Sequence, residues 1–229
     1  MRIGCHMSIS KGFAPMIQEA FMLGADIVQY FPKNPRSYRL KVFKADELRA
    51  AYEEISDLGI DTVAHSPYVT NLATGHTELR QTSITSILND LEIADAYGSA
   101  ALVVHCGKHV GQGEERGMAL MAEAVDEIMT LYSGPVRLLL ENTAGQGSEL
   151  GRTVDELLAL REQLDRPERV GFCFDTCHAF ASGLLDFDRW DEMVSELGRK
   201  EFAAHVHLLH LNDSLTPFGA RKDRHALLG

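Results

Sequence analysis

Five residues with metal-binding side chains stand directly after short apolar runs that are typical of β-strands. These residues are His65, His105, Glu141, Asp175 and His210. Imidazole nitrogens and carboxylate oxygens together suit Zn²⁺, and they suit Mn²⁺ where carboxylates dominate. His178 follows Asp175 after one helical turn, and Asp223 and His225 form a further pair near the C-terminus. The chain therefore carries eight candidate metal ligands.

Eight candidate ligands are too many for one tetrahedral ion, so they predict a site with two or three metal ions. A single histidine at a strand end is often only a hydrogen-bonded structural residue. Five metal-competent residues in register are harder to explain in that way, because unpaired charge buried at strand ends is costly. Multinuclear sites of this composition commonly hydrolyse phosphate esters. We therefore expect a metal-dependent hydrolase.

Apolar runs and segments of helical period alternate along the whole chain. Strands are expected near residues 2–5, 27–30, 62–64, 101–104, 136–140, 170–174 and 204–209. Helices are expected near residues 11–23, 45–58, 79–94 and 118–131, from Thr153 onward, and over residues 187–197. This alternation predicts right-handed βαβ units around a parallel sheet. Because the carboxyl ends of parallel strands point the same way, the five strand-end residues should converge on one face.

This alternation of strands and helices fits either a doubly wound sheet or a (β/α)₈ barrel. A barrel needs eight units, and the chain shows seven. No shift of composition and no linker divides the chain, so we expect a single domain over residues 1–229. With 45% apolar and 24% charged residues, the composition is that of a globular protein with a substantial core.

The net charge of −11 gives no general attraction to nucleic acid. Carboxylates that hold metal cations can account for such a charge, so the total excludes no DNA partner. We find no signal-peptide pattern and no apolar stretch of membrane-spanning length, so no membrane association is expected. We interpret the cysteines as reduced core thiols without a chemical role: Cys5, Cys106, Cys173 and Cys177. These features favour a cytoplasmic protein.

Four longer motifs together resemble the endonuclease IV family of zinc-dependent apurinic/apyrimidinic endonucleases. They are Glu141-Asn-Thr-Ala-Gly-Gln-Gly-Ser148, Asp175-Thr-Cys-His-Ala-Phe-Ala-Ser-Gly183, His210-Leu-Asn-Asp213 and Arg221-Lys-Asp-Arg-His225. Gly4-Cys-His-Met-Ser8 and Lys33-Asn-Pro-Arg36 look similar too. The motifs follow the family's order and approximate spacing from the first residues to the last. The resemblance implies a (β/α)₈ TIM barrel of base-excision repair that acts on double-stranded DNA with abasic sites and has no obligate protein partner.

The resemblance also implies three metal ions, usually zinc, with manganese possible at one site. It assigns the first ion to His65 and His105, the second to Asp175 and His210, and the third to His178, Asp223 and His225. Glu141 would bridge the first two ions and act as the catalytic residue that orients a metal-bridging hydroxide. The family cuts the backbone on the 5′ side of an abasic deoxyribose and leaves a 3′-hydroxyl and a 5′-deoxyribose phosphate.

Contacts to DNA are indicated by fewer residues. Arg36 and Tyr68 match family positions whose side chains enter the minor groove or stack, and the gap left by an extruded sugar needs such a wedge. Simple solvation explains exposed Arg and Tyr side chains equally well. His109 could contact phosphate or cap a helix, and Arg224 lies in a basic loop suited to phosphate contacts. His6 could stand behind the metals.

The chain departs from the family pattern near its C-terminus. The family continues into an eighth strand that supplies one more glutamate to the second metal, whereas no glutamate follows Glu201 here. We therefore expect a C-terminally truncated barrel, an open seam between the first and seventh strands, and a weakly held second metal. A xylose-isomerase-like sugar isomerase or epimerase, with one or two metals, is one alternative. An inactive fragment that only binds DNA or metal is the other.

Overall fold

The computed structural model describes residues 1–229. Seven strands form one parallel sheet: β1 (Gly4–His6), β2 (Ile27–Tyr30), β3 (Asp61–His65), β4 (Ala101–His105), β5 (Arg137–Glu141), β6 (Val170–Asp175) and β7 (Val206–His210). Seven α-helices connect them: α1 (Phe13–Met22), α2 (Ala45–Glu53), α3 (Thr77–Ala96), α4 (Glu114–Leu131), α5 (Val154–Glu162), α6 (Thr176–Ser182) and α7 (Trp190–Arg199). A small antiparallel pair, β8 (Asp213–Ser214) and β9 (His225–Ala226), lies near the C-terminus.

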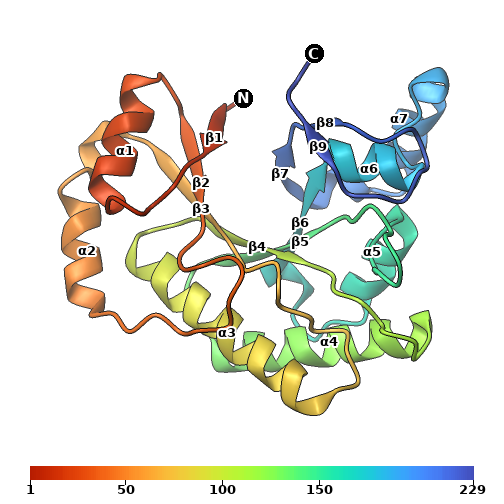
Figure 1. Cartoon of the computed structure of the whole chain (residues 1–229), viewed down its shortest axis with the longest axis horizontal. Helices are drawn as coiled ribbons and strands as arrows, with labels where there is room; N and C mark the ends of the chain where they lie inside the picture. The colour runs from red at the N-terminus through yellow and green to blue at the C-terminus, as the bar shows by residue number, and fades with distance from the viewer.

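The sheet curls into a half-barrel with the helices around its outside (Figure 1). Each strand pairs in parallel with the next one in the chain, so the strand order is consecutive from β1 to β7. A doubly wound sheet would instead reverse its order at a switch point. The barrel architecture expected from the sequence is therefore confirmed. β1 and β7 are the two edges and do not pair with each other, which leaves the expected open seam.

The two faces of the sheet bury different layers of side chains, because successive residues of a strand point to opposite faces. A cluster of 41 buried residues fills the space between the sheet and the helices. A cluster of five buried residues lines the inner face: Val63, Ala101, Val103, Leu139 and Cys173. His65, His105 and Glu141 follow the inner residues of their strands at a spacing of two. The candidate ligands thus lie on the inner face, at the carboxyl rim.

Several elements differ from the sequence-based expectation. The helix expected over residues 45–58 ends at Glu53, and a 3₁₀ turn at Ser56–Leu58 follows, with Gly59 in the left-handed conformation at φ 68°. Helix α6 and the β8–β9 pair were not expected. Cys5 is exposed on the edge strand β1, so its interpretation as a core thiol is wrong, because no further strand covers it. None of the helices has both the length and the apolar character needed to span a membrane.

Candidate metal centre

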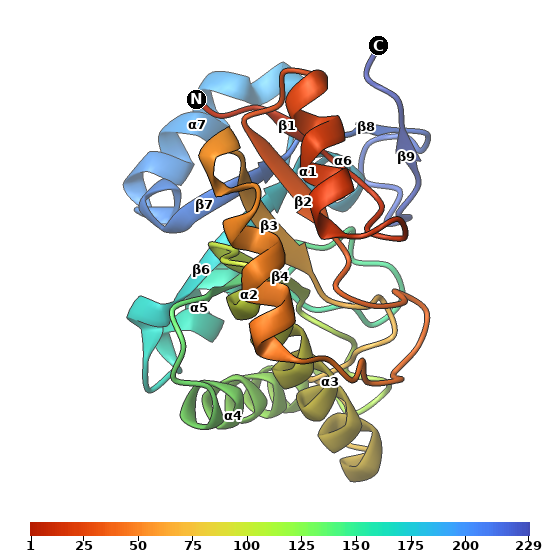
Figure 2. The same ribbon diagram turned by 90° about the vertical axis from the view of Figure 1, so that its left-hand side faces the viewer.

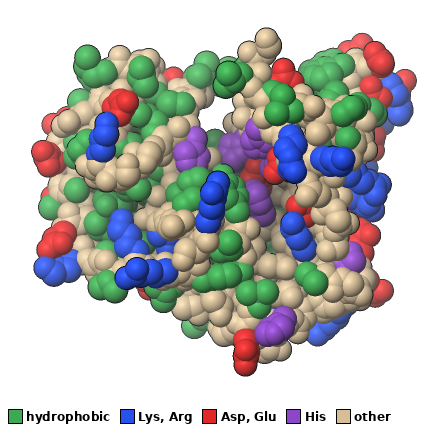
Figure 3. All heavy atoms as spheres, viewed as in Figure 1, with side chains coloured by type: hydrophobic (Ala, Val, Ile, Leu, Met, Phe, Trp, Pro, Cys, Tyr) green, Lys and Arg blue, Asp and Glu red, His purple; other side chains and the backbone are tan.

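The eight candidate ligands converge at the carboxyl rim of the half-barrel. Five of them are the last residues of β3 to β7, namely His65, His105, Glu141, Asp175 and His210. His178 lies in α6, which begins directly after β6, while Asp223 and His225 belong to the C-terminal segment that folds back over the rim. In the space-filling view, histidine side chains gather in the hollow between the N-terminal and C-terminal parts of the molecule (Figure 3).

Glu141 lies at the centre of the site and is almost fully buried. Its Oε2 atom lies 3.0 Å from His105 Nε2 and 3.2 Å from His65 Nε2. Its Oε1 atom lies 2.9 Å from His210 Nδ1. The two oxygens of one carboxylate therefore face two separate groups of imidazoles, which is the arrangement that a bridging ligand requires.

A second group forms around Asp175 and His210. His210 Nδ1 lies 3.6 Å from Asp175 Oδ2 as well as next to Glu141. Two asparagines hold the aspartate in place. Asn212 Nδ2 donates to Asp175 Oδ2 at 2.6 Å, and the Asp175 backbone N–H donates to Asn142 Oδ1 at 2.6 Å. Two carboxylates and one imidazole thus share this part of the site.

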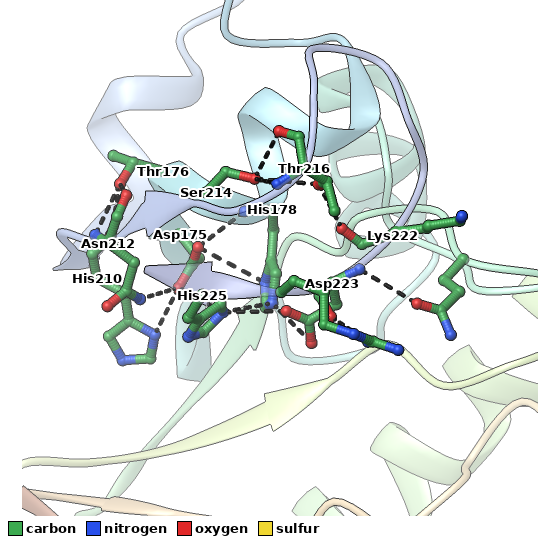
Figure 4. Close-up of polar contacts among 12 residues, drawn as sticks. Asp175, Thr176, His178, His210, Asn212, Ser214, Thr216, Lys222, Asp223 and His225 are labelled. Atoms are coloured by element: carbon green, nitrogen blue, oxygen red, sulfur yellow. Dashed lines mark hydrogen bonds and ion pairs between the residues drawn. The ribbon is translucent and has the colours of Figure 1, made fainter. Parts of the chain in front are cut away.

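A third group joins His178 to the C-terminal segment (Figure 4). Asp223 Oδ2 lies 3.4 Å from His178 Nε2, and Asp223 Oδ1 lies 3.2 Å from His225 Nε2. The two imidazole nitrogens are 3.3 Å apart. The Asp223 backbone N–H donates to Gln146 Oε1, which ties this segment to the loop after β5. The three side chains could hold one cation between them.

A hydrogen bond at one ring nitrogen orients each of three histidines. His65 Nδ1 lies 2.8 Å from the Ser66 carbonyl oxygen, and His178 Nδ1 lies 2.8 Å from the Asn142 carbonyl oxygen. His210 Nε2 lies 2.8 Å from Gln29 Oε1. A nitrogen that donates to an oxygen leaves the other nitrogen unprotonated, so each ring can present a lone pair to a metal. His6 Nδ1 bonds in turn to Gln29, which places His6 behind His210.

The carboxylates and imidazoles shift one another's ionisation. Burial raises the pKa of Glu141, but the nearby His105 and His210 outweigh it and hold the pKa well below its usual range. Burial lowers the pKa of His178, but its hydrogen bonds to Asp223 and Glu141 prevail and raise it to about 12. The pKa of His210 is raised too, so without metal the protons on His178 and His210 balance the buried carboxylate charge. Bound cations can supply the same balance by displacing those protons.

Two cysteines without a role in the sequence analysis lie beside these groups. Cys173 lies with Glu141 and His210, and Cys177 lies with Asp175 and His225. The sequence held a signal for the first of these positions, because Cys173 precedes Asp175 by two residues and so shares its face of β6. Burial raises the pKa of the Cys173 thiol to about 12.

The residues expected to contact DNA lie in three places. Arg36 and Tyr68 are exposed at the rim, and the Tyr68 ring centroid lies 5.9 Å from that of His105. Arg224 is exposed and bonds to the Asp223 carbonyl oxygen. His109 Nδ1 accepts a hydrogen bond at 3.2 Å from the backbone N–H of Gly113, the residue before α4, so this side chain holds the turn that leads into the helix.

The chain is similar to known proteins over almost its whole length. Residues 17–229 match the family model of the xylose isomerase-like TIM barrel. A protein of Symbiobacterium thermophilum named probable endonuclease 4 is 45% identical over 229 residues, which cover 100% of this chain and 83% of that protein. The crystal structure of endonuclease IV from Thermus thermophilus superimposes with a TM-score of 0.81 at 33% identity, covering 99% of this chain and 81% of that one.

Sugar epimerases share the architecture at much lower identity. A D-psicose 3-epimerase from Clostridium cellulolyticum matches with a TM-score of 0.67 and 13% identity, covering 92% of this chain and 73% of that chain. At this level of identity the match concerns the fold alone. The isomerase alternative therefore shares the architecture and the family model, whereas the relatives at 33% to 45% identity reported above are named endonuclease IV or probable endonuclease 4.

Proposed function

The chain belongs to the endonuclease IV family and is a DNA-cleaving hydrolase, and we propose that it cuts double-stranded DNA on the 5′ side of abasic sites. The cut would leave a 3′-hydroxyl and a 5′-deoxyribose phosphate, as in base-excision repair. The observation that carries this proposal is the position of Glu141, whose two oxygens face two separate groups of imidazoles.

We propose that the site holds three ions, most simply zinc, with manganese possible at one position. The donor atoms fit these ions, because the clustered side chains offer imidazole nitrogens and carboxylate oxygens within reach of one another. Bound cations lower the pKa of a coordinated water and take up the charge of a departing oxygen. In this proposal His65 and His105 would bind the first ion, and Asp175 and His210 would bind the second. The third ion would be bound by His178, Asp223 and His225.

Glu141 has the central role among the chain's own residues. As a buried, ionised carboxylate it holds the first two groups of ligands at a fixed separation. It can also accept a hydrogen bond from the attacking water and so orient that water toward the phosphorus. Hydrogen bonds to Gln29, Ser66 and Asn142 orient three imidazoles, so that one ring nitrogen of each remains free to bind an ion.

Substrate recognition would come from the rim beside these ligands. A cavity of about 260 Å³ lies between Tyr68, His105 and Lys108 and could receive an extruded sugar. We propose that Arg36 and Tyr68 fill the gap in the duplex and that Arg224 contacts a phosphate. His109 could reach phosphate only through Nε2, because its Nδ1 accepts the hydrogen bond from Gly113.

We also propose that residues 1–229 form one domain. A single buried cluster runs from Phe13 in α1 to Phe202 beside β7, so no boundary divides the core. Limited proteolysis should therefore give one resistant fragment, whereas two stable fragments would contradict the proposal.

A duplex with one abasic analogue tests the activity. We expect incision on its 5′ side, loss of incision on chelation, and recovery when zinc is restored. An undamaged duplex of the same sequence is the control. Equal cutting of both duplexes would contradict abasic specificity, and undiminished cutting after complete chelation would contradict the metal-dependent chemistry.

A further inference from the structure

The segment that carries Arg36 has no helix or strand of its own. Residues 31–44 connect β2 to α2 and pass beside α3 (Figure 2). Arg36 is exposed and its guanidinium forms no ion pair within the protein. An arginine that must enter a duplex at a defined point needs a fixed backbone beneath it. The contacts of this segment with α3 therefore decide where Arg36 can reach.

A buried ion pair attaches the start of this segment to α3. Lys33 Nζ lies 2.6 Å from Asp90 Oδ1 in α3 and donates to the Ser86 carbonyl oxygen at 2.6 Å. The two charged side chains are only 3% and 0% exposed. No other group bonds to the Asp90 carboxylate. Such a pair gains little net stability, because desolvation offsets the attraction, but separating its partners is costly, because it would leave a buried charge unpaired.

A second attachment to α3 involves Asn89, the residue directly before Asp90. The Lys41 backbone N–H donates to Asn89 Oδ1 at 2.9 Å, and Asn89 Nδ2 donates to the Lys41 carbonyl oxygen at 3.2 Å. Lys41 Nζ donates to the carbonyl oxygen of Pro32, directly before Lys33. Both ends of the stretch that contains Arg36 are thus attached to neighbouring residues of α3.

Two hydrogen bonds link the residues that follow Lys33 to the carboxyl rim of the half-barrel. Asn34 Oδ1 accepts from the Arg36 backbone N–H at 2.9 Å and closes a tight turn. The Pro35 carbonyl oxygen accepts from the Tyr68 backbone N–H at 2.9 Å. A shift of the backbone at Lys33 would therefore move Arg36 and also loosen Tyr68.

We propose that the Lys33–Asp90 ion pair is a positioning device for DNA recognition, which holds Arg36 and Tyr68 in a fixed arrangement against α3. Neither residue of the pair touches the substrate. The inference rests on the proposed function, because it takes Arg36 as a DNA contact. Its effect should fall on binding of the abasic duplex and not on the chemistry at the metals.

Lys33→Met tests the inference through kinetics. We expect KM for an abasic-analogue duplex to rise about tenfold while kcat changes less than about twofold. In a background with both Arg36→Ala and Tyr68→Ala the same substitution should change KM little, because the two residues that it positions are gone. A full tenfold effect in that background, or an unchanged KM in Lys33→Met alone, would overturn the proposal.

Two further variants separate positioning from folding. Lys33→Met combined with Asp90→Leu removes both buried charges and should fold as stably as the parent, yet keep the raised KM. Parent-like KM in that double variant would overturn the proposal. Arg80→Met is the matched control, since Arg80 forms a surface ion pair from the same helix to Glu123. It should leave KM unchanged, and a comparable rise would overturn the assignment to Lys33.

Amide hydrogen exchange tests the inference without any activity. Lys33→Met should speed exchange at Lys41 and Tyr68, whose N–H groups bond to Asn89 and Pro35. Unchanged exchange at both amides would overturn the proposal. Failure of the proposed function looks different, since the parent chain itself would then leave the abasic duplex uncut.

Discussion

Glu141 Oε1 lies 2.9 Å from His210 Nδ1, although Glu141 ends β5 and His210 ends β7, with β6 between them. The curl of the sheet brings the two strand ends together across the inside of the half-barrel. The other oxygen of the same carboxylate meets ligands from β3 and β4. One buried side chain therefore connects four strands, and its removal should affect the whole site.

Glu141→Gln should abolish incision, with a loss of at least about a thousandfold, while the fold remains. The amide is nearly isosteric but neutral, so it cannot bridge two cations as a carboxylate does. Incision rates and circular dichroism measured on the same preparation test this. Glu123→Gln, a surface substitution, is the control, and a near-normal rate in Glu141→Gln would refute the bridging role.

His225→Ala should cost the chain one bound ion and leave the other two in place. His225 lies closest to Asp223 and His178 of the third group, is 3.9 Å from Asp175 Oδ2 of the second, and contacts neither residue of the first. Metal content per chain, measured after removal of loosely bound ions, tests this. His76→Ala serves as the control, because His76 caps α3 and belongs to none of the metal-competent groups, so its loss should weaken stability without loss of metal. Loss of every ion in His225→Ala would contradict separate sites.

Apparent zinc affinity should rise with pH between pH 6 and 8. The folded, metal-free chain keeps His178 protonated, because its pKa is raised to about 12, and the pKa of His210 is raised as well. Metal must displace these protons, so each proton released should strengthen binding about tenfold per pH unit. Competition with a chromophoric chelator measures this dependence. An affinity that does not change over this range would show that the histidines bind metal without losing protons.

Cys173→Ala should leave the metal content unchanged although Cys173 lies beside Glu141 and His210. The imidazoles and carboxylates of the eight candidate ligands already offer donors for three ions, so the thiol is not needed as a ligand. We expect a modest loss of stability, about 1 to 2 kcal/mol, from the small cavity in the inner layer. Loss of one ion per chain would instead identify Cys173 as a ligand.

The convergence of the candidate ligands at the rim can be predicted from the sequence. Each strand-end ligand follows an apolar residue on the same face of its strand, as Glu141 follows Leu139. It also predicts the start of α5, where Thr153 accepts from the Glu156 backbone N–H at 3.1 Å. These signals are local in the chain. The partners that orient the imidazoles are not local, since Gln29 reaches His210 from a strand far away in sequence.

Other features escaped prediction for related reasons. Helix α6 is too short to show helical period, and it begins where Asp175 caps it through the His178 backbone N–H at 2.9 Å. The β8–β9 pair has only two residues in each strand, so no alternation marks it. The hydrogen bond from Gly113 to His109 depends on the shape of the turn before α4, which no local pattern in the sequence marks.

Titration of zinc into chelated protein, with incision of an abasic-analogue duplex followed at each step, tests the central claim most directly. We predict that incision on the 5′ side stays negligible until the ions shared by Glu141 are bound, and that it reaches its maximum near three ions per chain. Full incision by the metal-free chain, or no incision with all three ions bound, would contradict the account.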